Sequence, residues 1–263
     1  MELFKRQSPR RLHAEEIQNH YQINLGISTR IGGVSKDPFT SLNTGLHVGD
    51  DDADVIENRR RVLNEMNQSL SQAVFAEQVH GKRVAVVEKV DAGRGAYTLT
   101  DHIPGVDGLI TKASGVVLAQ FYADCVPLYF FDPVQRLIGI AHAGWKGTAK
   151  GMAKTMLETC LLLGSEIEHI HVAIGPAIEK EHYQVSRAVV EQMPLPITNE
   201  LATKLSEDQY VLDLKAVNEH YLVTLGVKPH HINKSSIDTY SHPDLYSFRR
   251  QQQTGRMMGY IFQ

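Results

Sequence analysis

Residues 120–148 constrain the fold of this chain more than any other stretch. Two apolar runs, residues 120–133 and 138–148, meet at an Asp132-Pro133 turn, and this pattern predicts two strands joined by a turn. The first run contains Cys125 and the second contains His142. Neighbouring strands can bring these two side chains together, and a thiolate with an imidazole suits zinc or copper.

A third candidate ligand, His80, ends a short predicted strand, and Gly81 lets the backbone turn away after it. Each ligand also has an ordinary interpretation, Cys125 as a small buried apolar side chain and the histidines as hydrogen-bonded core or rim residues. Two neighbours favour a site: Asp124 directly precedes the cysteine, and residues 143–147 form a small-residue turn. Carboxylates orient metal ligands, and glycines admit a substrate.

The composition is that of a soluble globular protein, with 42% hydrophobic and 22% charged residues among 263. A formal net charge of −3 gives no reason to expect nucleic acid or an anionic membrane as a partner. We therefore expect a small-molecule substrate. Cys125 and Cys160 lie in different contexts, which argues against a disulfide framework. With no signal peptide and no apolar run of about 20 residues, we expect a cytoplasmic protein.

Apolar periodicity and breaker residues predict the remaining elements. A helix is expected from near Asp52, where aspartates favour its positive end. Met152, Met156 and Cys160 share one helical face, so Cys160 is expected in the core. Strands are also expected over 23–28, 108–110, 116–119, 168–174 and 257–262, and residues 73–90 are expected to form two strand-like runs interrupted at residues 80–82. The remaining expectations are a helix over 148–163 that Thr148 caps and Gly164 stops, and a mainly helical segment over 202–221.

Strands come in clusters with helices between them, which favours an α+β fold with mixed β-sheets flanked by helices. No repeat or linker divides the chain, so we expect one domain over residues 1–263. The sequence carries no pattern that fixes its oligomeric state.

Three long and unusual strings identify a resemblance: Gln-Val-His-Gly at 78–81, Ala-Asp-Cys-Val-Pro at 123–127 and His-Ala-Gly-Trp-Lys-Gly at 142–147. Further matches lie at 29–35, 42–51, 106–111, 174–178, 246–250 and 254–256. Together they resemble the multicopper polyphenol oxidase family, the laccase-domain or YfiH/YlmD-like proteins. The resemblance implies the same α+β, YfiH-like fold and assigns the metal ligands to His80, Cys125 and His142.

Family members are described as copper phenol oxidases and as purine nucleoside enzymes that phosphorolyse or deaminate adenosine. A multicopper oxidase needs many histidine ligands, whereas His169 and His171 form the one His-x-His pair in this sequence. We therefore favour phosphorolysis of adenosine or inosine to the base and ribose 1-phosphate, with methylthioadenosine as a further candidate substrate and adenosine deamination as a further activity. Two imidazoles and one thiolate leave a fourth position open on zinc, as catalytic zinc sites do.

Three other functions fit the same residues. The first is copper-dependent phenol oxidation. The second is a metal-free amidase, in which Cys125 is the nucleophile and His142 its base. The third is a non-catalytic zinc- or copper-binding protein.

Candidate substrate contacts follow from side-chain chemistry. Guanidinium groups match phosphate oxygens, and a metal-activated water needs a carboxylate to move protons. Asn43 and His47 could contact base or ribose, although a turn role explains Asn43 equally well. The phosphate candidates are Arg30, Arg59, Arg249 and Arg250. A surface salt bridge is the alternative for each of them and is favoured for Arg59. The candidate proton carriers are Asp124 and Glu77.

Two positions depart from the family pattern. Asp238 and His182 stand where many relatives carry cysteine. His182 is either an added ligand or a surface residue, and we favour the surface role.

Overall fold

Two six-stranded sheets form the centre of the structure, a computed structural model that describes residues 2–263. The first sheet has the order β1 (Lys5–Ser8), β2 (Arg11–His13), β3 (Asn24–Ser28), β15 (Met257–Phe262), β7 (Val117–Tyr122) and β4 (Ala73–Phe75). The second has the order β14 (Ile232–Lys234), β10 (His171–Ile174), β8 (Val126–Asp132), β9 (Leu137–Ala143), β6 (Gly108–Thr111) and β5 (Val84–Val86). Both sheets mix parallel and antiparallel pairs.

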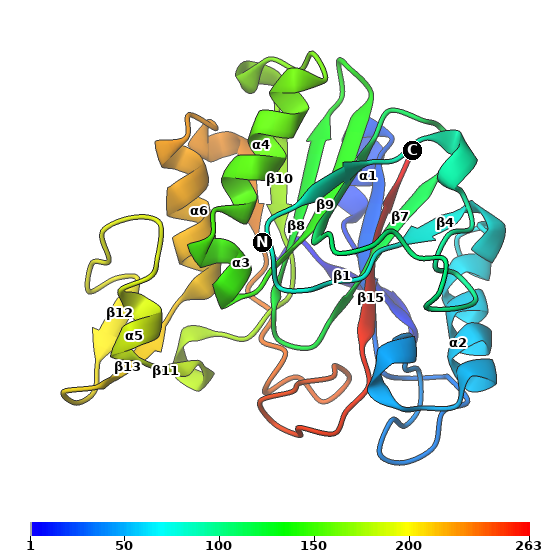
Figure 1. Cartoon of the computed structure of the whole chain (residues 1–263), viewed down its shortest axis with the longest axis horizontal. Coiled ribbons are helices and arrows are strands. Elements are labelled where there is room, and N and C mark those ends of the chain that lie inside the picture. Colours follow the sequence, from blue (N-terminus) through cyan, green and yellow to red (C-terminus); the bar gives the residue numbers. More distant parts are fainter. Residues whose placement is uncertain (1) are drawn as a thin grey trace.

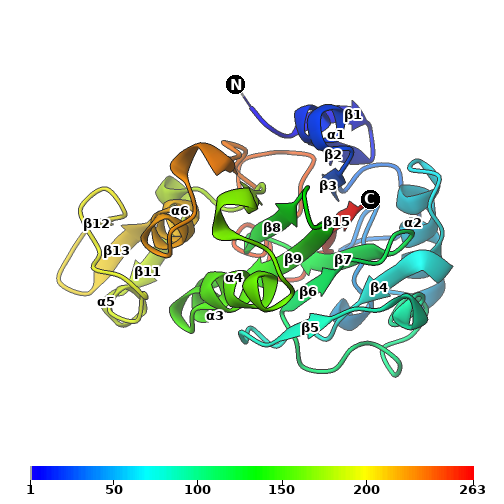
Figure 2. The ribbon, with the colours of Figure 1, turned by 90° about the horizontal axis from the view of Figure 1, so that it is seen from above.

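Helices cover the outer faces of the two sheets (Figures 1 and 2). Helix α2 (Asp52–Asn64) packs on the first sheet, and α4 (Met152–Leu162) and α6 (Leu214–Thr224) pack on the second. Helix α1 (Glu15–Tyr21) lies beside β3. A small third sheet, β11 (Gln184–Ser186), β13 (Gln209–Leu212) and β12 (Ala202–Lys204), lies at one end with α5 (Arg187–Val190). The predicted α+β fold with mixed sheets flanked by helices is confirmed.

The central strands β7, β8 and β9 are buried throughout and mostly apolar because both of their faces are covered. In β8, Val126 and Leu128 pack in the cluster that contains α4 and α6 residues, whereas Tyr129 and Phe131 pack between the sheets. Such a strand reads as a continuous apolar run. The turn at Asp132 and the pairing of the strands on either side of it are confirmed: Asp132 Oδ1 accepts hydrogen bonds from the backbone N–H of Val134 (2.8 Å) and Gln135 (3.1 Å). The run 120–133 is not one strand, because residues 120–122 end β7 of the first sheet and the loop 123–125, where Asp124 has a φ of 88°, separates them from β8.

The register of the second sheet brings three loop or strand ends together. Pro127 of β8 lies opposite His142 of β9, and Gly108 of β6 lies opposite Ala141. The residues that directly precede β8 and β6, Cys125 and Asp107, therefore reach the same end of the sheet as His142.

Several predicted boundaries differ from the structure. The segment 148–163 forms two helices, α3 (Trp145–Ala149) and α4, separated at Gly151, whose φ of 87° breaks the helix. Thr148 therefore lies inside α3 and does not cap the long helix. In 168–174 only β10 is a strand, and Ile167–His169 forms a 3₁₀ turn.

The prediction that the segment 202–221 is mainly helical is wrong. Strands β12 and β13 form a hairpin around the loop 205–208, and the helix starts only at Leu214. His80 also does not end a strand, since β4 stops at Phe75. The helix start near Asp52 is confirmed, with Asp51 capping it through the N–H groups of Ala53 and Asp54. Cys160 lies in the core, as predicted.

A search of residues 2–263 finds no helix that combines the length and apolar character needed to cross a membrane.

Candidate functional site

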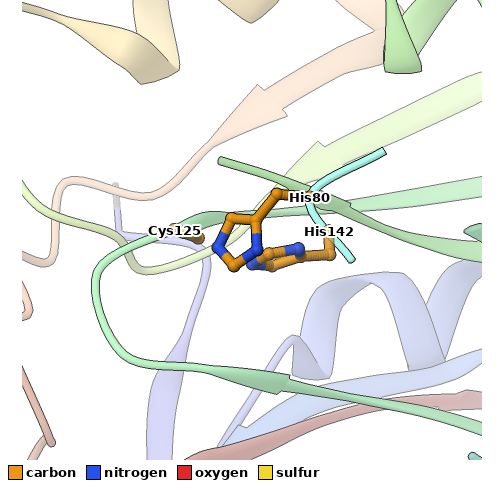
Figure 3. Close-up of side chains that lie close together, drawn as sticks. All are labelled: His80, Cys125 and His142. Carbon is orange, nitrogen blue, oxygen red and sulfur yellow. The ribbon is translucent and has the colours of Figure 1, made fainter. Parts of the chain in front are cut away.

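The side chains of His80, Cys125 and His142 converge at one end of the second sheet (Figure 3). One ligand atom from each lies within 4.8 Å of the others. Within residues 2–263 this is the one group of three or more histidine, cysteine or acidic side chains close enough to share a metal ion. The three residues come from segments that are far apart in the sequence, so the fold assembles the group.

Local backbone geometry aims two of these side chains. Asp124 has a φ of 88°, a left-handed conformation that turns the chain immediately before Cys125 and β8. His80 also has a positive φ, 54°, in the loop after β4. His142 is buried on β9, Cys125 is partly exposed and His80 is exposed. The group is therefore anchored at His142 and open at His80.

The carboxylate of Asp107 ties the two histidine segments together. Its Oδ1 lies 2.9 Å from His142 Nδ1 and accepts the backbone N–H of His80 (3.0 Å). Its Oδ2 accepts the backbone N–H groups of Val79 (3.1 Å) and Gly81 (2.7 Å). Asp107 thus fixes the ring of His142 and the loop that carries His80, as a carboxylate behind metal-binding histidines does.

Electrostatics favour a thiolate at Cys125. Burial would raise the pKa of its thiol, but the charge of His142 and hydrogen bonds with His142 and His80 lower it to about 6. Burial would lower the pKa of His142, but the charge of Cys125 and the hydrogen bond to Asp107 raise it to about 9. Burial would also raise the pKa of Asp107, but His142 and the loop N–H groups lower it.

The donor set fits a metal ion such as zinc. Two imidazoles and a thiolate are ordinary zinc ligands. Gly144 keeps the space beside them open, because a Cβ there would lie 2.8 Å from Cys125 Sγ and 3.4 Å from His80 Cδ2. The residues present therefore suit an ion with an open coordination position.

The three residues line a cavity of about 770 Å³, a size typical of small-molecule sites. Its walls are aromatic and cationic. The aromatic residues are Phe121, Trp145, Tyr183 and Phe248, and the cationic ones are Lys146, Arg249 and Arg256.

Four of the predicted substrate or proton-transfer residues line this cavity: His47, Glu77, Asp124 and Arg249. Asp124 is held by structural contacts, since Oδ1 accepts the Thr239 hydroxyl (2.7 Å) and Oδ2 accepts the Arg249 backbone N–H (2.7 Å). It therefore positions the Arg249 loop. Glu77 accepts the backbone N–H of Gly105 (2.9 Å), and its side chain is half exposed.

Four other predicted contacts lie outside the cavity lining. Arg59 is fully buried and donates to the carbonyl oxygens of Thr44, Gly95 and Ala96. Asn43 is also buried, and its amide closes a turn by accepting the Gly45 N–H (3.0 Å). Both side chains satisfy interior backbone groups instead of facing a ligand.

Arg30 and Arg250 are likewise occupied by the backbone. Arg30 donates to the carbonyl oxygen of Thr40 and stacks on Tyr246. Arg250 donates to the carbonyl oxygens of Tyr240, His242 and Leu245.

Asp238 and His182 pair with each other, with 2.7 Å between Asp238 Oδ2 and His182 Nδ1. Asp238 Oδ1 also accepts the backbone N–H of Glu179 (3.0 Å), and the His182 ring stacks on Tyr240. Neither residue belongs to the cavity lining.

Sequence reasoning did not assign roles to Asp107, Arg256 or Lys146. Asp107 and Arg256 do lie in the strings 106–111 and 254–256 that carry the family resemblance. An acidic residue directly before a short strand-like segment, here Gly108–Thr111, is the signal that could have identified Asp107 as a buried and functional carboxylate.

The chain is similar to known proteins over most of its length. The family model described as "Multi-copper polyphenol oxidoreductase laccase" matches residues 24–263. The chain is 43% identical to "Purine nucleoside phosphorylase YlmD" of Bacillus subtilis over 94% of this chain and 91% of the relative. It is 44% identical to the protein of that name from Geobacillus stearothermophilus over 90% and 88%.

Solved structures show the same fold. The crystal structure of YlmD from Geobacillus stearothermophilus superposes with a TM-score of 0.95 at 39% identity, covering 100% of this chain and 99% of that one. The crystal structure of the Bacillus licheniformis hypothetical protein YfiH gives 0.95 at 40% identity, covering 98% of each chain.

Replacing Asp107 should weaken metal binding without removing a ligand. We expect Asp107→Asn to lower the affinity for zinc about 10- to 100-fold, because the His142 ring and the His80 loop lose their shared anchor. Competition with a zinc chelator measures the effect. Glu77→Gln is the matched control, since Glu77 lines the cavity but holds neither histidine. Equal zinc affinity in wild type and Asp107→Asn contradicts the assignment.

The thiol of Cys125 should titrate well below an ordinary cysteine in metal-free protein. With a pKa of about 6, the thiolate predominates above that pH and is lost below it. His142→Ala should raise the midpoint, because the charge that lowers the pKa is removed. Ultraviolet thiolate absorbance against pH measures this. Cys160 contributes nothing near neutrality because burial raises its pKa to about 12, and an unchanged midpoint in His142→Ala contradicts the coupling.

Proposed function

The chain belongs to the multi-copper polyphenol oxidoreductase laccase family, and from this premise we propose that it is a metal-dependent purine nucleoside phosphorylase. Its substrates are adenosine and inosine, and its products are the free base and ribose 1-phosphate. One observation carries the proposal: the His80, Cys125 and His142 group lies in the wall of a cavity that also presents flat aromatic rings and cationic side chains. Relatives named purine nucleoside phosphorylase support it.

The cavity suits a nucleoside together with an anion. Phe121, Trp145 and Phe248 line it, and aromatic faces stack on nucleobases with about 1–3 kcal/mol per base. Lys146, Arg249 and Arg256 line it as well, and cations stabilise a transferring phosphate. These two kinds of wall correspond to the two substrates of phosphorolysis.

In the reaction, a phosphate oxygen forms a bond to C1′ of the ribose while the bond from C1′ to the purine nitrogen breaks. The base leaves with the electron pair of that bond and then takes up a proton. The sugar passes through an oxocarbenium-like state, so the aromatic wall must hold the base while the cations hold the phosphate against the opposite face of C1′.

Zinc is the metal we propose, held by His80, Cys125 and His142. When bound, zinc would act as a Lewis acid that polarises an oxygen atom of the substrate. Asp107 keeps the His142 ring oriented for this role, and Gly144 leaves the approach open. Copper is the alternative metal, because a thiolate with two imidazoles also suits it.

Adenosine deamination is a second candidate, favoured by the position of Glu77. Its carboxylate lies on the cavity wall and is half exposed, so it can move protons for a water that attacks the purine ring and displaces ammonia.

Both cysteines are free, which fits a reducing cytoplasmic location.

Product analysis tests the proposal. Zinc-loaded protein is incubated with adenosine or inosine, with and without phosphate, and the products are separated chromatographically. We expect adenine or hypoxanthine only when phosphate is present, with turnover abolished in Cys125→Ala because a metal ligand is lost.

Other products identify the alternatives. Inosine from adenosine, independent of phosphate, shows deamination. A metal-loaded sample that yields no purine product contradicts the nucleoside proposal and leaves phenol oxidation, amide hydrolysis or metal binding alone.

A further inference from the structure

We propose that Arg256 and His47 form the subsite for the inorganic phosphate co-substrate, which we call the oxyanion corner. This inference rests on the proposed phosphorolysis and adds to it the location of the second substrate.

Arg256 offers an unpaired guanidinium edge. Its Nη1 donates to the carbonyl oxygens of Thr254 (2.9 Å) and Gly255 (3.0 Å), and its guanidinium lies 5.9 Å from the ring centroid of Phe248. Among residues 2–263, neither Nε nor Nη2 has a hydrogen-bond partner, and no carboxylate pairs with this side chain. The Nε–Nη2 edge is the part of a guanidinium that binds two oxygens of a phosphate.

The side chain is also partly removed from water. Burial lowers the pKa of Arg256, while the charges of Cys125 and Asp124 raise it. A cation without full solvation binds an anion more strongly than one on the open surface.

His47 adds a neutral donor beside this cation. Its ring faces the cavity and packs against Phe121, 5.6 Å between centroids, and within the described chain it forms no hydrogen bond. Burial and the charges of Arg256, Arg59, His142 and His80 lower its pKa to about 4. At neutral pH the ring therefore presents one N–H donor and one acceptor nitrogen, which suits a partly protonated phosphate.

Side chains of the 43–45 turn and close packing at Gly45 hold His47 and Arg256 side by side, although 209 positions separate them in the sequence. A Cβ added to Gly45 would lie 2.9 Å from Arg256 Cγ and 3.1 Å from His47 Cε1. Asn43 Oδ1 accepts the backbone N–H of both Gly45 (3.0 Å) and Arg256 (2.8 Å). The Thr44 hydroxyl donates to the Arg256 carbonyl oxygen (2.7 Å).

Arg59 supports the corner from behind. Its Nε donates to the Thr44 carbonyl oxygen (2.7 Å), and its guanidinium lies 4.9 Å from the ring centroid of Phe121. Arg59 and Asn43 are therefore positioning residues that fix His47 and Arg256 and do not touch the substrate.

The other two cations of the cavity are less suited to this role. Arg249 Nη1 donates to the carbonyl oxygens of His182 (3.2 Å) and Gln184 (3.0 Å), its guanidinium stacks on Tyr183, and the residue is exposed. Lys146 is exposed and lies over Trp145.

Steady-state kinetics with phosphate and inosine varied separately test the corner. We expect Arg256→Met to raise the KM for phosphate about 10- to 100-fold, because the phosphate loses its hydrogen bonds to a charged group. The KM for inosine should change far less. Arg256→Lys should recover part of the loss, since it restores charge but not the bidentate edge. Arg249→Met, the matched variant of another cavity arginine, should raise the phosphate KM much less than Arg256→Met.

His47→Leu keeps the ring-sized apolar contact with Phe121 and removes the donor. It should also raise the phosphate KM selectively, and it tests the corner if Arg256→Met fails to fold. A wild-type phosphate KM in both variants overturns the inference. A rise in the inosine KM alone overturns it too, because the corner would then bind the nucleoside.

Calorimetry separates this inference from the proposed function. Inorganic phosphate, and sulfate as an unreactive analogue, are titrated into zinc-loaded protein without nucleoside. Binding to wild type that is lost in Arg256→Met supports the corner even if no phosphorolysis is found. Phosphate-dependent turnover by wild type together with undiminished phosphate binding by Arg256→Met supports the function and overturns the corner.

Discussion

One buried carboxylate, that of Asp107, organises the site. An unpaired buried carboxylate is costly, and this one is satisfied by four donors: His142 Nδ1 and the backbone N–H groups of residues 79–81. The backbone carbonyl oxygen of Asp107 also accepts the His142 N–H (2.8 Å). Because β6 and β9 are paired, Asp107 can hold a strand residue with one oxygen and the long His80 loop with both. The geometry of the proposed metal ligands depends on these contacts.

The two sheets contribute different residues to the site. The second sheet presents Cys125 and His142 at the ends of its apolar strands, where the register is fixed by covered faces on both sides. The first sheet presents Phe121 from β7 and, just before β15, Arg256. Because the cavity lies where both sheets contribute residues, rigid strands position the ligand group, and the 43–47 turn completes the proposed phosphate subsite.

The sequence predicted the structural features that depend on local residue patterns, and it predicted fewer of those that depend on partners distant in the sequence. The apolar runs around Asp132 predicted β8 and β9 correctly, whereas the break at Gly151 and the 202–212 hairpin were missed, because a left-handed glycine and pairing with β11 overrode local helical preference. The strings around His80, Cys125 and His142 suggested a triad that the fold does bring together. In contrast, the sequence did not indicate that the guanidinium of Arg59 donates hydrogen bonds to interior carbonyl oxygens, because these partners lie far away in the sequence.

The proposed reaction requires that His80, Cys125 and His142 together hold one metal ion in the cavity. X-ray absorption spectroscopy of zinc-loaded protein tests it most directly. We expect one sulfur neighbour at about 2.3 Å from the zinc and two imidazole nitrogens at about 2.0–2.1 Å, with a light atom in the remaining position. A zinc shell that contains no sulfur, or the same spectrum from Cys125→Ala, would contradict it.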